Sequence, residues 1–192
     1  MNSKGYSLLE VLMTMTLMVI LGGAAIPLAH NSVDRSRAVG AAGYVAGRMA
    51  LARFEAVKRS AHVAIRFTAQ PDGYWLQSYV DGNRNGVLTR DIALGVDPAI
   101  SAAERLDYHF RGVEFGIAPN VTGIDPGPFS ASDPIQIGSS TLLSFSPTGS
   151  CTSGTLFIRG LRGHQFAVRV LGTTGRTRIF EFNFGARAWR TR

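Results

Sequence analysis

The chain has 192 residues, a mass of 20.6 kDa and a formal net charge of +7 at neutral pH. Hydrophobic residues make up 45% of it and charged residues 17%, which excludes a highly charged disordered polymer and suits one ordinary domain with an appendage. A single cysteine, Cys151, excludes an intrachain disulfide and any metal site built from several cysteines.

The N-terminus has a short polar start and then a long apolar run. Residues 11–29 carry no charge, and a helix of that length rises roughly 28 Å, close to the roughly 30 Å of a hydrocarbon core. A cleaved secretory signal, a plain signal anchor and a buried core helix are competing interpretations. None of them explains Glu10, because a carboxylate at the edge of a membrane span is costly and implies a partner.

The segment Gly5-Tyr6-Ser7-Leu8-Leu9-Glu10 resembles the class III leader junction of type IV pilins and type II secretion pseudopilins. The resemblance implies that a prepilin peptidase removes residues 1–5 by cutting after Gly5, and methylates the new N-terminus at Tyr6. It also implies that Glu10 pairs in the membrane with the N-terminal amine of a neighbouring subunit. Such pairing offsets the desolvation of both charges and fixes the axial step between subunits.

Helical spacing of apolar residues continues beyond the apolar run. The pattern predicts one helix over residues 6–59, roughly 80 Å long, with a membrane half at 6–29 and an amphipathic half at 30–60 that packs on a head domain. Residues 22–27 contain two glycines and Pro27, where the helix is expected to kink or melt during packing. The apolar stripe consists of Ala38, Ala42, Val45, Met49, Ala52 and Ala56.

Residues 61–192 show the alternating apolar pattern of β-strands. The stretch 119–140 is rich in Gly, Pro, Ser and Asp and predicts a long surface loop. Together with the helix, the pattern predicts an α+β chain whose long N-terminal helix packs on a head of antiparallel sheets. Strands are predicted at 62–68, 73–80, 91–94, 113–117, 142–145, 155–159, 164–170 and 178–184.

Several segments of the head resemble the GspH/FimT group of minor pilins and pseudopilins. The resemblance implies a globular domain of two antiparallel sheets behind the helix, and a low-copy subunit at a filament tip rather than the bulk subunit. The segments that carry it are 52–59, the strand that follows, the loop 81–91, the run 145–149 and Gly175-Arg176-Thr177-Arg178.

The loop that starts at Asp81 imitates the start of a calcium loop, with the pattern D-x-N-x-N-G. A complete loop needs a bidentate glutamate at its twelfth position, which here holds Ile92, and Arg84 adds a cation among the would-be ligands. Asn-Gly and Asp-Gly are also ordinary hairpin residues, so a plain hairpin turn is expected and no metal site is predicted.

Catalytic patterns are weak throughout the sequence. The four histidines at 30, 62, 109 and 164 have no metal-ligand spacing, and neither a nucleophile elbow nor a phosphate-binding loop is present. Cys151 has no second cysteine near it, which favours a buried structural thiol over a reactive one. We therefore expect no enzyme activity and no cofactor.

Positive charge gathers at the C-terminus. Residues 1–66 carry a net charge of +5 and residues 67–150 a net charge of −5, whereas residues 151–192 carry eight arginines against Glu181 alone, a net of +7. Such asymmetry indicates a localised anion-binding surface.

The run Gly175-Arg176-Thr177-Arg178 resembles the G-R-x-R element that DNA-binding members of the family use in natural transformation. The resemblance predicts phosphate contacts with a steep salt dependence from Arg176, Arg178, Arg187, Arg190 and Arg192. Trp189, Phe180 and Phe184 would add stacking if exposed. Strand alternation instead turns the phenylalanines at 180, 182 and 184 toward the core. A solvated basic face, or one that packs on acidic filament subunits, is the alternative interpretation.

The sequence therefore supports two main functional hypotheses. The first is a structural minor pilin or pseudopilin of a type IV pilus or a type II secretion system, held in the inner membrane by a single span with a periplasmic head. Its expected partners are other pilins or pseudopilins, the prepilin peptidase and the inner membrane. The second adds double-stranded DNA as a partner in natural transformation. A membrane-anchored enzyme is a third and weaker hypothesis.

Overall fold

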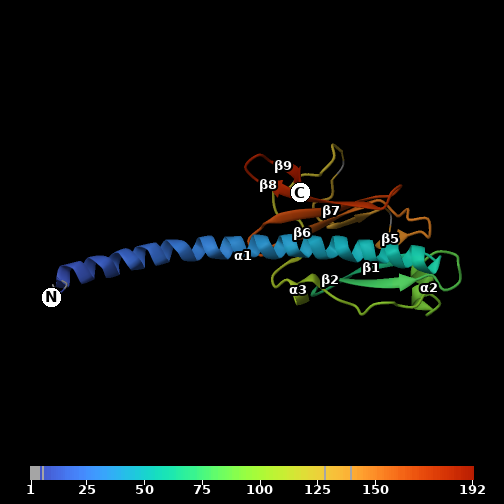
Figure 1. Cartoon of the computed structure of the whole chain (residues 1–192). Helices are drawn as coiled ribbons and strands as arrows, with labels where there is room; N and C mark the ends of the chain where they lie inside the picture. The colour runs from blue at the N-terminus through green and yellow to red at the C-terminus, as the bar shows by residue number, and fades with distance from the viewer. Residues whose placement is uncertain (1–4, 6, 128, 139) are drawn as a thin grey trace.

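The computed structural model describes residues 5, 7–127, 129–138 and 140–192, without the side chains of residues 24–30. A single long helix, α1 (Leu8–Arg59), leads into a β-rich head that packs along the C-terminal half of the helix (Figure 1). The predicted α+β fold, with a long N-terminal helix on an antiparallel β head, is confirmed.

Helix α1 has clear signals at both ends. Its 52 residues rise roughly 78 Å. Ser7 caps the start by accepting a hydrogen bond from the backbone N–H of Leu9, and Ser60 ends the helix in the left-handed conformation with a φ of 51°. The helix is continuous through residues 22–27 in the single chain, and the kink or melting expected there during packing stays a prediction. One proline removes a single hydrogen bond of the ladder, and the turns on either side maintain the helical course.

The head contains two antiparallel sheets. The first has the strand order β2-β1-β5, and the second has the order β3-β6-β7-β8-β9 with β4 beside β6. The strands are β1 (Val63–Gln70), β2 (Gly73–Val80), β3 (Glu114–Phe115), β4 (Ile135–Ile137), β5 (Leu142–Phe145), β6 (Gly154–Arg159), β7 (Gln165–Leu171), β8 (Arg176–Asn183) and β9 (Ala188–Thr191).

Most strand predictions are confirmed to within a few residues, and one is wrong. The predicted strand at 91–94 is part of a short helix, α2 (Thr89–Ala93). Asp91 turns its carboxylate back into the preceding loop, where it accepts hydrogen bonds from the side-chain amides of Asn83 and Asn85. The predicted loop at 119–140 contains β4, and both β9 and the helix α3 (Leu106–His109) were not predicted.

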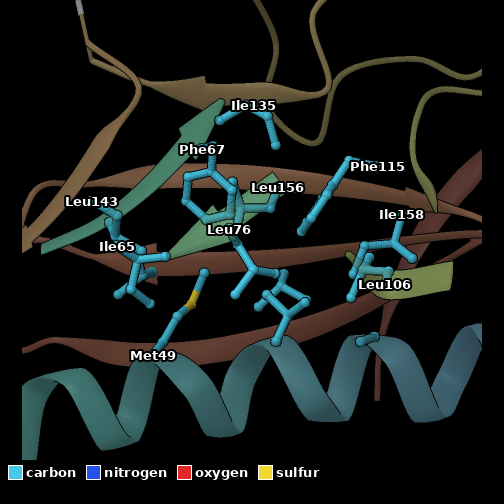
Figure 2. Close-up of a cluster of buried hydrophobic side chains, with 14 of the residues drawn as sticks. Met49, Ile65, Phe67, Leu76, Leu106, Phe115, Ile135, Leu143, Leu156 and Ile158 are labelled. Atoms are coloured by element: carbon cyan, nitrogen blue, oxygen red, sulfur yellow. The ribbon is translucent and has the colours of Figure 1, made fainter. Parts of the chain in front are cut away.

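The main core lies between α1 and the two sheets (Figure 2). All six residues of the predicted stripe on α1, from Ala38 to Ala56, are buried, which confirms the stripe. Met49 points from the helix toward Ile65 of β1, and Phe67 and Leu76 of the same sheet lie beyond it (Figure 2). The alanines let the helix approach both sheets closely, so α1 closes the core of the head.

Contacts at one end of the head fix the axial position of α1 relative to the head. Nε2 of His164 lies 2.8 Å from the side-chain oxygen of Asn31. One turn further, the carboxylate of Asp34 accepts hydrogen bonds of 3.0 Å from the backbone N–H groups of Leu161 and Arg162. We call this end of the head the proximal end.

The opposite end of the head, which we call the distal end, lies beside the C-terminal part of α1. Nε of Arg53 donates a hydrogen bond of 3.0 Å to the carbonyl oxygen of Gly149. Gly175, with a φ of 62°, approaches the same guanidinium so closely that a Cβ there would lie 2.9 Å from Nε. Figure 1 shows α2 at this end as well.

The carboxylate of Asp34 is expected to stabilise the proximal end, because it is only 5% exposed and accepts two backbone donors. We expect Asp34→Ala to cost about 2 kcal/mol of unfolding free energy, since both N–H groups lose their acceptor. Thermal and urea unfolding of the detergent-solubilised chain would measure the change. Asp133→Ala is the matched control, because Asp133 also accepts a backbone N–H but is exposed, so that water replaces it. Equal losses in the two variants would contradict the expectation.

Candidate functional site

The predicted processing and assembly residues lie at the start of α1. Gly5 is exposed, and a Cβ added to it would meet no atom of the described residues within 4 Å, its chain neighbours aside. Tyr6 lies outside the described residues. Glu10 is in the first turn of α1 and is exposed, with no ion-pair partner among the described residues. A carboxylate near a helix N-terminus is favoured by the helix dipole, but nothing within the described part of the chain neutralises it.

Apolar side chains cover every face of the helix around Glu10. The large apolar residues between Leu8 and Leu21 are between 42% and 81% exposed. The hydroxyls of Thr14 and Thr16 donate to carbonyls of their own helix, which removes them as free polar groups. Across the described residues, whose side chains leave a gap at 24–30, no helix combines the length and the apolar character needed to cross a membrane.

The five predicted DNA-binding arginines do not form one surface. Arg176 and Arg178 lie at the start of β8, at the distal end of the head, and both are exposed. Arg187 lies in the turn after β8 at the proximal end, with a φ of 49°. Seven strand residues separate the two ends of β8, a span of roughly 23 Å.

Arg190 and Arg192 lie on the other face of the sheet from Arg176 and Arg178. Arg190 is directly opposite Glu181 in the β8–β9 register, and Glu181 faces α1, where it forms an ion pair with Arg35 at 2.7 Å. Nη1 of Arg192 lies 3.7 Å from the same carboxylate. These charges hold the pKa of Glu181 below its usual range, mainly through the Arg35 hydrogen bond. This half of the arginine set is partly neutralised within the head.

The predicted stacking residues are only partly available. Trp189 donates its indole N–H to the carbonyl of Thr122 at 2.8 Å and packs on Phe182, which is only 4% exposed. Phe184 is 45% exposed. Ile179, not the phenylalanines, points from β8 into the main core. The phenylalanine face of β8 covers a smaller core instead, and Arg176 and Arg178 share that face because strand positions alternate.

The loop after Asp81 is built on buried carboxylates rather than on a hairpin turn. Asp81 accepts hydrogen bonds from the backbone N–H groups of Arg84 and Gly86 at 2.7 Å each. Asp97 accepts from the backbone of Gly82 and Leu88 at 3.0 Å. The loop therefore satisfies its carboxylates with its own donors. Within the described residues, no group of three or more His, Cys, Asp or Glu side chains is placed to hold a metal ion.

Cys151 and the cleft that Arg105 and Arg159 line have the features of structural elements. Burial raises the pKa of the Cys151 thiol, which lowers its thiolate fraction, and its Sγ lies 3.6 Å from the carbonyl of Leu171. A cleft of about 490 Å³ contains two arginines, and both are paired: Arg105 with Asp72, and Arg159 with Glu114. The cleft thus presents saturated ion pairs rather than a free nucleophile and base.

Comparison with known proteins bears on the N-terminus most directly. Residues 1–26 match the family described as the prokaryotic N-terminal methylation motif. The chain carries a prepilin-type N-terminal methylation motif. The resemblance to type IV pilin-like proteins, drawn from Gly5, Tyr6 and Glu10, is thereby confirmed for this segment.

Beyond this segment, the similarity of the chain to known proteins is more distant. No curated protein matches the sequence. Among solved structures, the chain is similar to the minor pseudopilin EpsH from the type 2 secretion system of Vibrio cholerae. The identity is 16% and the TM-score 0.48, and the similarity covers 76% of this chain and 97% of that one.

A polar cluster that the sequence did not predict also fixes helix α1 to the head. Glu104 accepts a hydrogen bond of 2.6 Å from the hydroxyl of Tyr44 and lies 3.0 Å from Nε2 of His109. Its other oxygen lies 3.0 Å from Nε of Arg48, a half-buried ion pair without an aligned hydrogen bond. Tyr44 and Arg48 are four residues apart on α1, beside the buried stripe. This spacing of four places both side chains on one face of the helix, and it is the one sign of the cluster in the sequence. It does not identify Glu104 as their partner.

Burial, followed by the hydrogen bond to Glu104, raises the pKa of Tyr44 to about 12. The neutral phenol is thus favoured in the folded chain. The stabilisation of the folded chain by this raised pKa is complete below the pKa of an unfolded tyrosine, about 10. It is lost as the pH rises above that value. We expect an absorbance titration of tyrosinate to show a step near pH 12 that Tyr44→Phe removes and Tyr74→Phe retains. A step that persists in Tyr44→Phe would contradict this assignment.

Proposed function

We propose that the chain is a minor pilin or pseudopilin, which acts by assembly in a type IV pilus or a type II secretion pseudopilus. One observation carries the proposal: the segment that matches the prepilin-type methylation motif contains the start of an apolar helix whose large side chains are exposed and whose one carboxylate, Glu10, has no partner among the described residues. Apolar side chains on every face of a helix need either lipid or other helices around them. A filament subunit meets both environments in turn.

The dimensions of α1 support a membrane segment at 6–29. Among the described side chains of α1, the first hydrogen bond to the head is that of Asn31, and the helix before it extends away from the head (Figure 1). From Leu8 to Asn31 the helix is roughly 35 Å long, comparable to the roughly 30 Å of a hydrocarbon core. Before assembly, the subunit would reside in the inner membrane with its head in the periplasm. It would then enter a filament with other pilins or pseudopilins.

Pairing of Glu10 gives the assembly step its driving force. The prepilin peptidase cuts after Gly5, which frees an amine at Tyr6 that is then methylated. In the filament, the amine of one subunit lies against the Glu10 carboxylate of its neighbour. Each charge is costly in lipid on its own, and pairing offsets most of that cost. The pair also selects one axial offset between neighbouring helices.

Replacing Glu10 should block assembly without blocking processing. Leaving one member of a buried ion pair alone costs about 3–5 kcal/mol, so Glu10→Leu should lower incorporation into filaments by about 100-fold or more. Immunoblots of sheared filaments, from cells that contain the other subunits, measure incorporation. Thr14→Leu is the matched control, because Thr14 is exposed on the same helix and carries no charge.

Intact masses of the membrane-extracted variants separate assembly from processing. Each variant is expected to lack residues 1–5 and to carry one methyl group at Tyr6. Wild-type levels of Glu10→Leu in filaments would overturn the proposed role of Glu10. A native chain that retains Met1 to Gly5 would overturn the pilin assignment itself.

DNA binding is a second candidate function, favoured by the strip of Arg176 and Arg178 at the distal end. Both side chains are exposed, and neither has an acidic partner in the described part of the chain. The cross-strand neighbour of Arg178 is Arg169, which is paired with Asp125. The strip therefore offers two free guanidinium groups, which bind phosphate oxygens in the bidentate mode.

The salt dependence of DNA binding distinguishes the strip from the whole arginine set. Two phosphate contacts give a slope of about −2 for log affinity against log salt, whereas five give about −4.5. We expect a slope near −2 for the detergent-solubilised chain on duplex DNA, lost in Arg176→Ala plus Arg178→Ala. Arg190→Ala plus Arg192→Ala is the control and should bind as the native chain does. No binding at low salt would eliminate this function.

A further inference from the structure

We propose that the proximal end of the head docks on anionic phospholipid headgroups of the membrane that α1 enters. The inference rests on the proposed function in one respect, because it takes residues 6–29 as the membrane segment. The occupant of the surface is thus a lipid layer with phosphate groups.

Strand order brings two turns to the proximal end. Strands β6 to β9 are consecutive and antiparallel, so the β6–β7 turn and the β8–β9 turn lie at the same end of the sheet. Each turn carries one exposed apolar side chain and one exposed arginine. In the first turn Leu161 is 77% exposed and Arg162 follows it. In the second turn Phe184 is 45% exposed and Arg187 lies three residues on.

The height of the first turn follows from its contacts with α1. The backbone of Leu161 and Arg162 is hydrogen-bonded to Asp34, five residues beyond the end of the segment 6–29. Five residues of helix rise about 7.5 Å. The headgroup layer on each side of a bilayer is about 5–7 Å thick, from the difference between its full thickness and its hydrocarbon core. The first turn therefore lies level with the headgroups.

The second turn has a similar height. Glu181 of β8 pairs with Arg35, one residue after Asp34, and the chain then continues toward the N-terminal side of α1. Arg187 follows the end of β8, and its left-handed φ of 49° turns the chain back into β9. Both turns thus form one rim around the point where α1 enters the head (Figure 1).

The charge of this rim is positive by count, because Arg35, Arg162, Arg187 and Arg192 lie there against Asp34 and Glu181. Asp34 is occupied by backbone donors, and Glu181 by Arg35 and Arg192. Beside the first turn, Glu114 pairs with Arg159, and Asp107 accepts from Arg105 and from the backbone of Gly112. Arg162 and Arg187 have no acidic partner among the residues that the structure describes, and neither has Arg111 in the neighbouring loop.

An exposed leucine or phenylalanine beside a free arginine suits the interface of a bilayer. The apolar group enters the boundary of the acyl chains, while the guanidinium stays among the phosphates and binds two oxygens at once. Leu94 at the distal end is equally exposed, at 70%, but it lies near the buried carboxylates of Asp91 and Asp97 rather than free arginines. Exposed apolar groups also lie beside the free Arg176, with Leu171 opposite it in the β7–β8 register, but they stand at the distal end, away from the membrane segment.

A tryptophan at position 161 reports the docking directly. The full-length Leu161→Trp chain is reconstituted into vesicles that contain phosphatidylglycerol and acyl-brominated phosphatidylcholine, and into vesicles without phosphatidylglycerol. Leu94→Trp is the matched control, and the quenching of the native Trp75 and Trp189 is subtracted with the unsubstituted chain. We expect strong quenching at 161 in the anionic vesicles, weaker quenching in high salt, and little quenching at 94.

Charge variants test the role of the arginines. Loss of one arginine near an anionic surface should lower the ratio of docked to undocked heads about fivefold. Arg162→Gln and Arg187→Asn should each do so, and asparagine tolerates the left-handed backbone at 187. Arg84→Asn is the matched control, because Arg84 is exposed at the distal end and also has a positive φ, of 66°. It should leave the quenching at position 161 unchanged.

Each of the following outcomes would overturn the inference. Equal quenching at 161 and 94, or quenching that ignores phosphatidylglycerol and salt, eliminates specific docking on anionic lipid. Quenching at 161 that is absent until other filament subunits are added identifies the rim as a protein interface instead. A chain that vesicles release in an alkaline wash contradicts the membrane segment, and hence the proposed function. Retention in the wash without quenching at 161 contradicts the docking alone.

Discussion

The fixed axial position of one helix relative to its head is the constraint on which the rest of the structure depends. The stripe from Ala38 to Ala56 closes the core between the two sheets, so a shift along the helix would expose the core. Asp34 fixes the register at the proximal end and Arg53 fixes it at the distal end. Because the helix is continuous, Glu10 lies at a set distance from the head, roughly 36 Å below Asp34. Any axial step selected by Glu10 is therefore transmitted to the head.

The parts of this arrangement that follow a local period could be predicted from the sequence. The alanine stripe has the spacing of a helix, and β1, β2 and β5 to β8 have the alternation of strands, so both were found. The helix at 89–93 was missed because Asp91 is held by the side chains of Asn83 and Asn85, a contact that no period reveals. The cluster around Glu104 joins residues sixty positions apart, and it also depends on the tertiary fold.

The distribution of charge over the folded surface is another feature that the sequence could not predict. Residues 67–150 carry a net charge of −5 and the last 42 residues a net charge of +7. This asymmetry predicted a single surface that binds anions. Folding brings these two segments together, so Arg159 and Arg169 pair with Glu114 and Asp125. Glu181 forms ion pairs with both Arg35 and Arg192. Arg159, Arg169 and Arg192 of the tail thus form ion pairs with carboxylates. A count of charges along the chain does not show these pairs.

The arginines that remain are separated by the direction of β8. Strand β8 begins at the distal end with Arg176 and Arg178 and runs toward the proximal end, where Arg187 follows it. Two free guanidinium groups at each end meet different surroundings: exposed strand at the distal end, and turns with apolar tips beside Arg162 and Arg187 at the proximal end. Because the two ends lie roughly 23 Å apart, beyond the Debye length of about 8 Å in physiological salt, their electrostatic interactions are largely independent. One arginine-rich tail therefore supplies two separate groups of free arginines, and substitutions at one end are expected to leave the other nearly unchanged.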